Sequence, residues 1–193
     1  MIHRLSRFIR VLLVFSGFRF RLRYDDRRIL EEVILPGFGR DSHVQRVLFI
    51  GCQWYTAWYH RFFRRAEYWT MDINPSCAAF GAKHHVTAGV QNVARHFASA
   101  SLDLVVCNGV FGWGLDNRDD VEKAFSGIAR CLAPGGVFVL GWDDTPNRKP
   151  FPPEEAATLY FKRHIYEPLG NWRIRTANRH TFDFYVVESK PTS

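Results

Sequence analysis

The sequence predicts an α/β fold, doubly wound around a mostly parallel sheet that closes with an antiparallel hairpin. One observation is the alternation of short apolar runs with helical patterns, which is typical of parallel sheets covered by helices on both faces. Another is the stretch Gln45 to Asp72, which gives a strand, a turn, a helix and a second strand that ends on an acid. The third is the pair of short strand patterns Trp172–Thr176 and Thr181–Val187 near the C-terminus. Together these observations predict seven strands.

Length and charge set the outline of the molecule. A chain of 193 residues with 47% hydrophobic residues is enough for one domain with one packed core. We divide it into a basic N-terminal helical arm, residues 1–44, and a main domain, residues 45–193. The net charge of +7 favours an anionic partner such as nucleic acid, a membrane surface or an acidic metabolite. Charge alone does not choose among them.

The start of the arm, residues 2–16, has the pattern of an amphipathic helix. Ile2, Leu5, Ile9 and Leu12 share one face, and arginines crowd another. Its apolar stretch is too short for the hydrophobic region of a signal peptide. Two interpretations remain open. The helix packs over the domain with its arginines in water, or it lies peripherally on an anionic membrane with its arginines among the headgroups.

The rest of the arm has two further patterns. Phe18–Tyr24 alternates apolar residues with arginine, as in a half-exposed strand or an extended arm. Asp25 or Asp26 is then expected to cap a helix that runs through Leu35 and ends at Pro36.

The main domain gives the alternating elements in order. The predicted strands are Val47–Ile50, Tyr68–Met71, His84–Thr87, Leu102–Cys107 and Val137–Gly141. The predicted helices are Thr56–Arg65, Cys77–Ala82, Val93–Phe97, Asp119–Leu132 and Glu154–Tyr166. Pro75 suits a first helical turn with Asn74 as its cap.

The four cysteines, Cys52, Cys77, Cys107 and Cys131, lie far apart and have no ligand-like spacing. We therefore predict neither a metal site nor a disulfide framework, but reduced core thiols in a cytoplasmic protein. No apolar run approaches the roughly 20 residues needed to span a bilayer.

At these residues the chain resembles class I S-adenosylmethionine-dependent methyltransferases, in particular the type 11 methyltransferase domain. The resemblance covers roughly residues 45–187 and rests on the motifs VLFIGC, YWTMD, LDLVVCNGVF and ARCLAPGGVFVLGW. It implies a seven-stranded, Rossmann-like methyltransferase sheet with a C-terminal antiparallel hairpin. It also implies an enzyme with S-adenosylmethionine as cofactor.

One departure from the family pattern falls in the turn after the first strand. Of the family's alternating glycines only Gly51 is present, and Gln53 and Tyr55 take the other glycine positions. Glycine matters there because the backbone approaches the ligand closely. Either the turn follows a different path that still admits the cofactor, or cofactor binding is weakened or lost.

The resemblance implies a set of cofactor-binding residues at the carboxyl ends of the strands. Asp72 would accept hydrogen bonds from the ribose hydroxyls, Ile73 would touch the adenine, and Gln91 or Asn92 would meet its amino group. Asn108 and Gly109 would lie beside the methyl group. The full set is Gly51, Cys52, Gln53, Tyr55, Asp72, Ile73, Gln91, Asn92, Asn108 and Gly109.

Catalytic candidates follow the same strands. Asp143, directly after the fifth strand, is the first choice as a general base, and Asn108 would orient the acceptor. Asp144, Asp116 and His60 are weaker candidates for the base. Trp113 and Trp142 would wall an acceptor pocket, or pack in the core.

The predicted function is methyl transfer to a small-molecule or lipid-linked acceptor. The first alternative is a non-catalytic, methyltransferase-like binding or scaffold protein, which the altered turn favours. The second is a nucleic-acid methyltransferase, which the charge favours. It ranks lower because Asn108-Gly109-Val110-Phe111 replaces the base-gripping Asn-Pro-Pro-aromatic motif. The acceptor, the oligomeric state and the role of the arm are left open.

Overall fold

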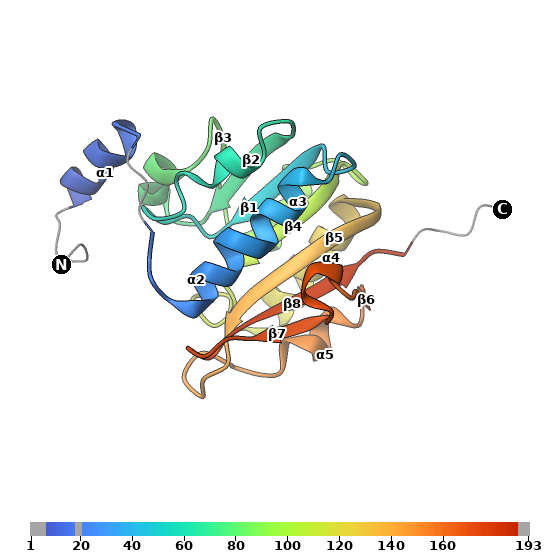
Figure 1. Ribbon diagram of the computed structural model, residues 1–193. Coiled ribbons are helices and arrows are strands. Elements are labelled where there is room, and N and C mark those ends of the chain that lie inside the picture. The colour runs from blue at the N-terminus through green and yellow to red at the C-terminus, as the bar shows by residue number, and fades with distance from the viewer. Residues whose placement is uncertain (1–6, 18–20, 189–193) are drawn as a thin grey trace.

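The computed structural model describes residues 7–17 and 21–188, which contain one eight-stranded sheet (Figure 1). Its spatial order is β3-β2-β1-β4-β5-β8-β6, and β7 also pairs with β8. The strands are β1 Arg46–Ile50, β2 Glu67–Asp72, β3 His84–Thr87, β4 Leu102–Asn108, β5 Leu132–Asp143, β6 Lys162–Arg163, β7 Arg173–Arg175 and β8 His180–Val186.

The doubly wound, mostly parallel arrangement is confirmed. β3, β2, β1, β4 and β5 pair in parallel, and β8 runs antiparallel to β5. The predicted hairpin is β7 and β8, and the eighth strand is the two-residue β6, which shares the outer edge of β8 with β7. Ile50 pairs with both Met71 and Cys107, so β1, β2 and β4 end at one level. That level is the carboxyl edge of the sheet.

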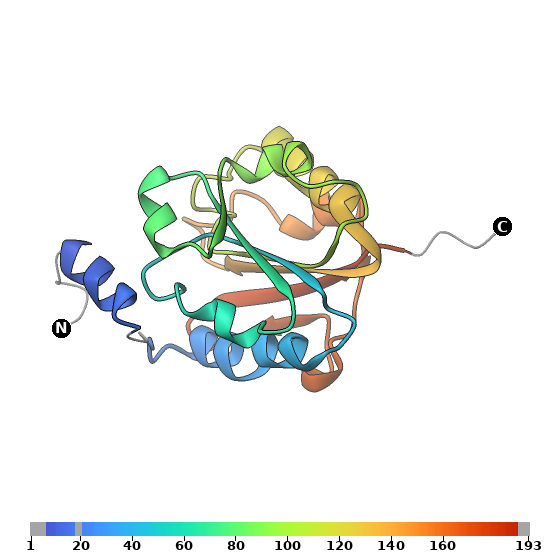
Figure 2. The same ribbon diagram turned by 90° about the horizontal axis from the view of Figure 1, so that it is seen from above.

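Helical segments cover both faces of the sheet (Figure 2). One core cluster joins the segment at 25–40 to Val47, Phe49 and Val106, and the other joins α4 to Leu48 and Val105 on the opposite face. The elements of the first face are α2 Asp25–Ile29, η2 Leu30–Ile34, α3 Leu35–Arg40 and η3 Tyr59–Phe62. The remaining helical elements of the described chain are η4 Pro75–Phe80, η5 Val90–Arg95, α4 Arg118–Cys131, α5 Pro153–Ala157 and η6 Glu167–Leu169.

The helix predicted to stop at Pro36 continues to Arg40 through a π turn, so that prediction was wrong. A proline inside an α-helix lacks an N–H and clashes with the carbonyl four residues earlier. The wider turn at Leu30–Ile34 comes directly before Pro36 and fits this need. The predicted caps are wrong too, because Tyr24 is the N-cap residue and makes no side-chain bond there.

The predicted helix Thr56–Arg65 is replaced by turns and the short 3-10 helix η3. Trp58, Tyr59 and Phe63 all pack into one core cluster, and aromatic residues favour helix weakly. The predicted helices at 77–82 and 93–97 are likewise 3-10 turns, η4 and η5, and Asn74 caps η4 as expected.

The predicted helix Glu154–Tyr166 was also wrong after its first turn. Phe161 packs in the core cluster on one face of the sheet, while Tyr166 packs on the other face, stacked on Phe184 at 4.7 Å. The chain must therefore pass around the sheet edge between them. The extended pair Lys162–Arg163, β6, makes that passage.

Within the arm, α1 spans Arg7–Phe15. Ile2 and Leu5 lie outside the described residues, and Ile9 and Leu12 are exposed rather than packed. Val11, Leu13 and Val14 instead pack against a cluster formed by Trp54 and Phe80. None of the described helices has the length and apolar character needed to cross a membrane. The arm as a unit of residues 1–44 remains a prediction, although its residues 25–40 contribute to the main core.

Glu31, buried on η2, predicts a pH-dependent stability. Burial raises its pKa to about 7, although Tyr59 donates a 2.8 Å hydrogen bond to it. Between the ordinary pKa of 4.5 and about 7, the folded chain keeps a proton that the unfolded chain has lost, so stability falls as pH rises through this window. We expect Glu31→Gln to raise the melting temperature relative to wild type by ~3 °C more at pH 8 than at pH 4.5.

Thermal melts at a series of pH values measure this difference. Glu32→Gln, on the exposed neighbouring residue, is the matched control and should show a constant difference. Parallel curves for Glu31→Gln and wild type would contradict the expectation.

Candidate active site

A cavity of about 680 Å³ lies at the carboxyl edge of the sheet. This volume is within the usual range for small-molecule sites. Its wall includes the ends of β1, β2, β4 and β5, the start of β8 and the first turn of the helix at 25–40. Nine of the ten predicted cofactor residues line it: Gly51, Cys52, Gln53, Tyr55, Asp72, Ile73, Gln91, Asn108 and Gly109.

The altered turn after β1 keeps the cavity open. Asp72 accepts hydrogen bonds from the backbone N–H groups of Cys52, at 2.7 Å, and Asn74, at 2.8 Å. Each carboxylate oxygen therefore fixes one loop and retains a further lone pair. Tyr55 lines the cavity, whereas the Trp54 ring is buried against Phe80 and away from it.

Gly51 is the point where the first turn meets the end of β4. Its φ is +98°, and a Cβ there would lie 2.4 Å from the Asn108 carbonyl oxygen. This close approach explains why Gly51 alone remains of the family's glycines, since Gln53 and Tyr55 take paths without positive φ.

We expect Gly51→Ala to destabilise the fold and to weaken cofactor binding at least tenfold, because the carbonyl must shift away from the cavity floor. The control is Gly135→Ala, which shares the positive φ of +79° but meets no atom within 4 Å. Strain of the backbone alone costs about 1–2 kcal/mol. Thermal melts should show a clearly larger loss for Gly51→Ala, and equal losses would contradict the expectation.

The adenine end of the predicted site is partly apolar. Ile73 is 68% exposed although it lines the cavity, so an apolar ligand face has a surface to cover. Val90 and Gln91 line the same end, from η5. Asn92 is not among the lining residues. Its N–H closes the turn onto the Gly89 carbonyl, one position too far along the 3-10 helix to face the cavity.

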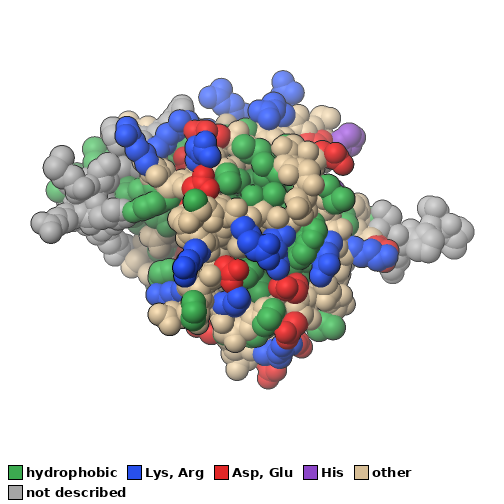
Figure 3. Space-filling view, turned by 60° about the horizontal axis from the view of Figure 1, so that its bottom comes forward, with side chains coloured by type: hydrophobic (Ala, Val, Ile, Leu, Met, Phe, Trp, Pro, Cys, Tyr) green, Lys and Arg blue, Asp and Glu red, His purple; other side chains and the backbone are tan. Residues whose placement is uncertain are grey.

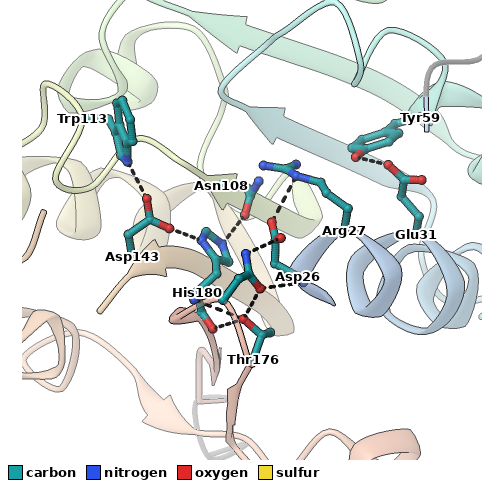
Figure 4. A network of polar contacts seen from close by, with 10 residues as sticks. Asp26, Arg27, Glu31, Tyr59, Asn108, Trp113, Asp143, Thr176 and His180 are labelled. Carbon is teal, nitrogen blue, oxygen red and sulfur yellow. Dashed lines mark hydrogen bonds and ion pairs between the residues drawn. The ribbon is translucent and has the colours of Figure 1, made fainter. Parts of the chain in front are cut away.

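A chain of polar contacts occupies the other end of the cavity (Figure 4). Trp113 donates from Nε1 to Asp143 at 2.9 Å. The other Asp143 oxygen lies 2.6 Å from His180 Nδ1, and His180 Nε2 lies 3.0 Å from Asn108 Oδ1. Asp143 has a lowered pKa, first because His180 hydrogen-bonds to it, while burial opposes this and Trp113 supports it. Asp143 is therefore an ionised and weak base.

His180 was missed by the sequence analysis. It is 3% exposed and is the first residue of β8. The antiparallel pairing of β8 with β5 places it opposite Asp143. The sequence pattern could have placed His180 at the site. A hairpin strand that runs antiparallel to the fifth strand must begin near the residue where the fifth strand ends.

The remaining catalytic candidates lie elsewhere. Asp144 pairs with Lys149, Asp116 is exposed on a loop, and His60 bonds the Ala57 carbonyl, all outside the cavity lining. Trp113 lines the cavity, whereas Trp142 is buried and donates to Asp183, so it is a core indole. Within the described residues no group of three His, Cys, Asp or Glu side chains is placed to hold a metal, and all four cysteines are buried and free.

Arg27 is a second residue that the sequence did not single out. It lines the cavity from α2, is 9% exposed, and its guanidinium lies over the Tyr55 ring at 4.8 Å. Its Nε pairs with Asp26 at 3.1 Å. Asp26 is held in turn by Asn178, which donates at 2.7 Å.

Comparison with known proteins identifies the domain. Residues 48–140 match the family model described as a methyltransferase domain. No curated protein sequence matches the chain. The predicted resemblance to S-adenosylmethionine-dependent methyltransferases is confirmed, and with it the enzyme class and the cofactor.

Solved structures share the fold at low sequence identity. The N-methyltransferase NodS from Bradyrhizobium japonicum WM9 is 16% identical, with a TM-score of 0.63 over 85% of this chain and 97% of that chain. A TehB-like SAM-dependent methyltransferase from Corynebacterium glutamicum is 14% identical, with a TM-score of 0.58 over 92% and 93%. The Thermus thermophilus 16S rRNA N2 G1207 methyltransferase RsmC is 15% identical, with a TM-score of 0.53 over 83% and 40%. These likenesses show the fold and leave the acceptor class undetermined.

Proposed function

We propose that this S-adenosylmethionine-dependent methyltransferase transfers a methyl group directly to a small-molecule acceptor, free or lipid-linked. The observation that carries the proposal is the division of one cavity into two ends. Asp72 and Ile73, which would hold a nucleoside, lie at one end, and the contact chain from Trp113 to Asn108 lies at the other. β1 and Gly51 separate them in the sheet order.

The residues of the first end fit the cofactor. The carboxylate of Asp72 has lone pairs left for two hydroxyl groups, Ile73 offers an uncovered apolar surface, and Gly51 leaves the floor without a side chain. These features support a working site despite the altered turn. When bound, S-adenosylmethionine supplies an electrophilic methyl group on a positively charged sulfur.

The residues of the second end would position and deprotonate the acceptor. Asn108, on the cavity floor, would orient the acceptor group, and in-line positioning supplies much of the rate. His180 would take the acceptor's proton at Nε2, while the ionised Asp143 on Nδ1 stabilises the imidazolium. Nε2 has a single lone pair when the ring is neutral, and in this structure it faces the Asn108 amide. The acceptor's O–H or N–H would therefore displace that amide from Nε2 before its proton moves to the ring. Asp143 thus acts through His180 instead of as the base itself.

A nucleic-acid acceptor is the second candidate, because the net charge is +7. Figure 3 shows lysines and arginines interspersed with acidic and hydrophobic side chains on the face in view, without the continuous basic stripe that favours binding to the nucleic-acid backbone.

The location of the protein is part of the proposal. The four buried, reduced thiols support a reducing compartment such as the cytoplasm, and the amphipathic helix α1 is compatible with a peripheral membrane contact.

Two measurements test the proposal. Calorimetry with S-adenosylmethionine should give micromolar binding, and labelled methyl transfer to fractionated small metabolites should give a labelled product. Absence of binding at millimolar ligand would favour the non-catalytic scaffold. Transfer to RNA or DNA, together with salt-dependent retention on it, would favour the second candidate.

A further inference from the structure

The guanidinium of Arg27 has more donors than the protein satisfies. Within the described part of the chain its ion pair runs from Nε to Asp26, and Nη1 is buried with no hydrogen-bond partner. Arg27 is also the one lysine or arginine among the described residues that line the cavity, beside four aspartates. A buried charged donor without a partner destabilises the folded state, so its presence calls for an explanation.

The side chain is held ready for a planar anion. The Tyr55 ring supports one face of the guanidinium, and Asp26, fixed by Asn178, holds its Nε edge. The guanidinium fork matches the two oxygens of a carboxylate or phosphate, and such charge-assisted pairs are among the stronger hydrogen bonds. Because the side chain is ordered before binding, less entropy is lost when the anion arrives.

The position of Arg27 places that anion at the reacting end. Its positive charge contributes to the lowered pKa of Asp143, which ends β5. Asp26, its neighbour, is bonded to Asn178 in the turn just before β8. Asp72, in contrast, ends β2 and Ile73 follows it, across β1 in the sheet.

We propose that the methyl acceptor is an acidic small molecule whose carboxylate or phosphate is bound by Arg27. The anion would hold the molecule while its hydroxyl or amino group lies over Asn108, within reach of His180. This inference rests on the proposed function and adds the chemical class of the acceptor. The charge of the bound acceptor would also offset that of this buried guanidinium, whose Nη1 has no hydrogen-bond partner.

The test is binding of small anions to the protein saturated with S-adenosylhomocysteine. Benzoate, benzamide and inorganic phosphate are titrated separately by calorimetry into wild type and Arg27→Gln. We expect benzoate or phosphate to bind at least tenfold more tightly than benzamide in wild type, and Arg27→Gln to lose that preference. A comparison of the benzoate and phosphate affinities shows whether the site prefers a carboxylate or a phosphate.

Matched variants locate the effect. Arg28→Gln removes the same charge from the next residue of the same helix, whose side chain is 68% exposed, and should leave anion binding unchanged. Arg27→Lys keeps the charge but loses the fork, so we expect an intermediate loss. Thermal melts check that each variant is folded, and Arg27→Lys carries the test should Arg27→Gln fail to fold.

Three outcomes would overturn the proposal. The first is that neither anion binds to wild type, and the second is that anion binding survives in both Arg27 variants. The third is that Arg27→Gln weakens S-adenosylhomocysteine binding tenfold or more, which would assign Arg27 to the carboxylate of the cofactor's own amino-acid portion. Failure of wild type to bind S-adenosylhomocysteine at all would contradict the proposed function itself, and the saturation step reveals that result separately.

Discussion

Replacing Asp72 by asparagine is expected to weaken S-adenosylmethionine binding by about 100-fold. Two hydroxyl groups of the ribose would each donate to the carboxylate, and hydrogen bonds to a charged acceptor contribute roughly 1.5–3 kcal/mol each. Loss of about 2.7 kcal/mol in total corresponds to a factor of about 100 in the dissociation constant. Asparagine keeps the size of the side chain and one acceptor oxygen, so the change isolates the charge and the second acceptor.

Asp72 also fixes two loops, and the experiment must separate that role. Its oxygens accept from the N–H groups of Cys52 and Asn74, so we expect the melting temperature of Asp72→Asn to fall by a few degrees. Calorimetry is therefore run well below the melting temperature. Asp116→Asn, an exposed residue outside the cavity, is the control of equal charge. A dissociation constant within threefold of wild type for Asp72→Asn would refute the assignment.

The strands β1, β4 and β5 were predictable because each contains a continuous apolar run. β3 has the predicted bounds, and β1, β2 and β4 differ from theirs by one residue at one end or at both. The helices were less predictable, because packing decided them. The aromatic residues Tyr59 and Phe63 pack into the core from turns and a short 3-10 helix instead of the predicted α-helix, and Tyr166 had to reach the far face of the sheet. A pattern of residues along the chain does not show which face a side chain must reach.

The residues of the candidate site also differ in how far the sequence could predict them. Asp72 and Asn108 end strands and Gly51 directly follows one, so their place at the carboxyl edge follows from the parallel sheet alone. Arg27 and His180 reach the cavity from α2 and from β8, which are distant from each other in sequence. Their roles depend on pairing and packing, through Asp143 opposite His180 and Tyr55 under Arg27. The place of His180 could still be inferred from the hairpin pairing, whereas no local pattern in the sequence marks the contact of Arg27 with Tyr55.

His180 carries the second large expected effect. We expect His180→Gln to lower kcat by about 10²- to 10³-fold, the usual contribution of a general base, while the dissociation constant for S-adenosylmethionine changes less than threefold. Glutamine still donates a hydrogen bond but does not take up a proton. The measurement is turnover as a function of pH, with the acceptor that labelled methyl transfer identifies.

The pH profile separates a base from a residue that only positions Asn108. If His180 takes the proton, His180→Gln loses the acidic limb of the profile, and added imidazole restores part of the rate to His180→Ala. Asp143→Asn should retain more activity than His180→Gln, because it removes the partner of Nδ1 and leaves the imidazole in place. If instead His180→Gln matches Asn108→Ala in rate and keeps the wild-type limb, His180 acts only through the amide that it contacts. The acceptor would then be a group that is already unprotonated at neutral pH, or its proton would pass to Asp143, the carboxylate beside His180.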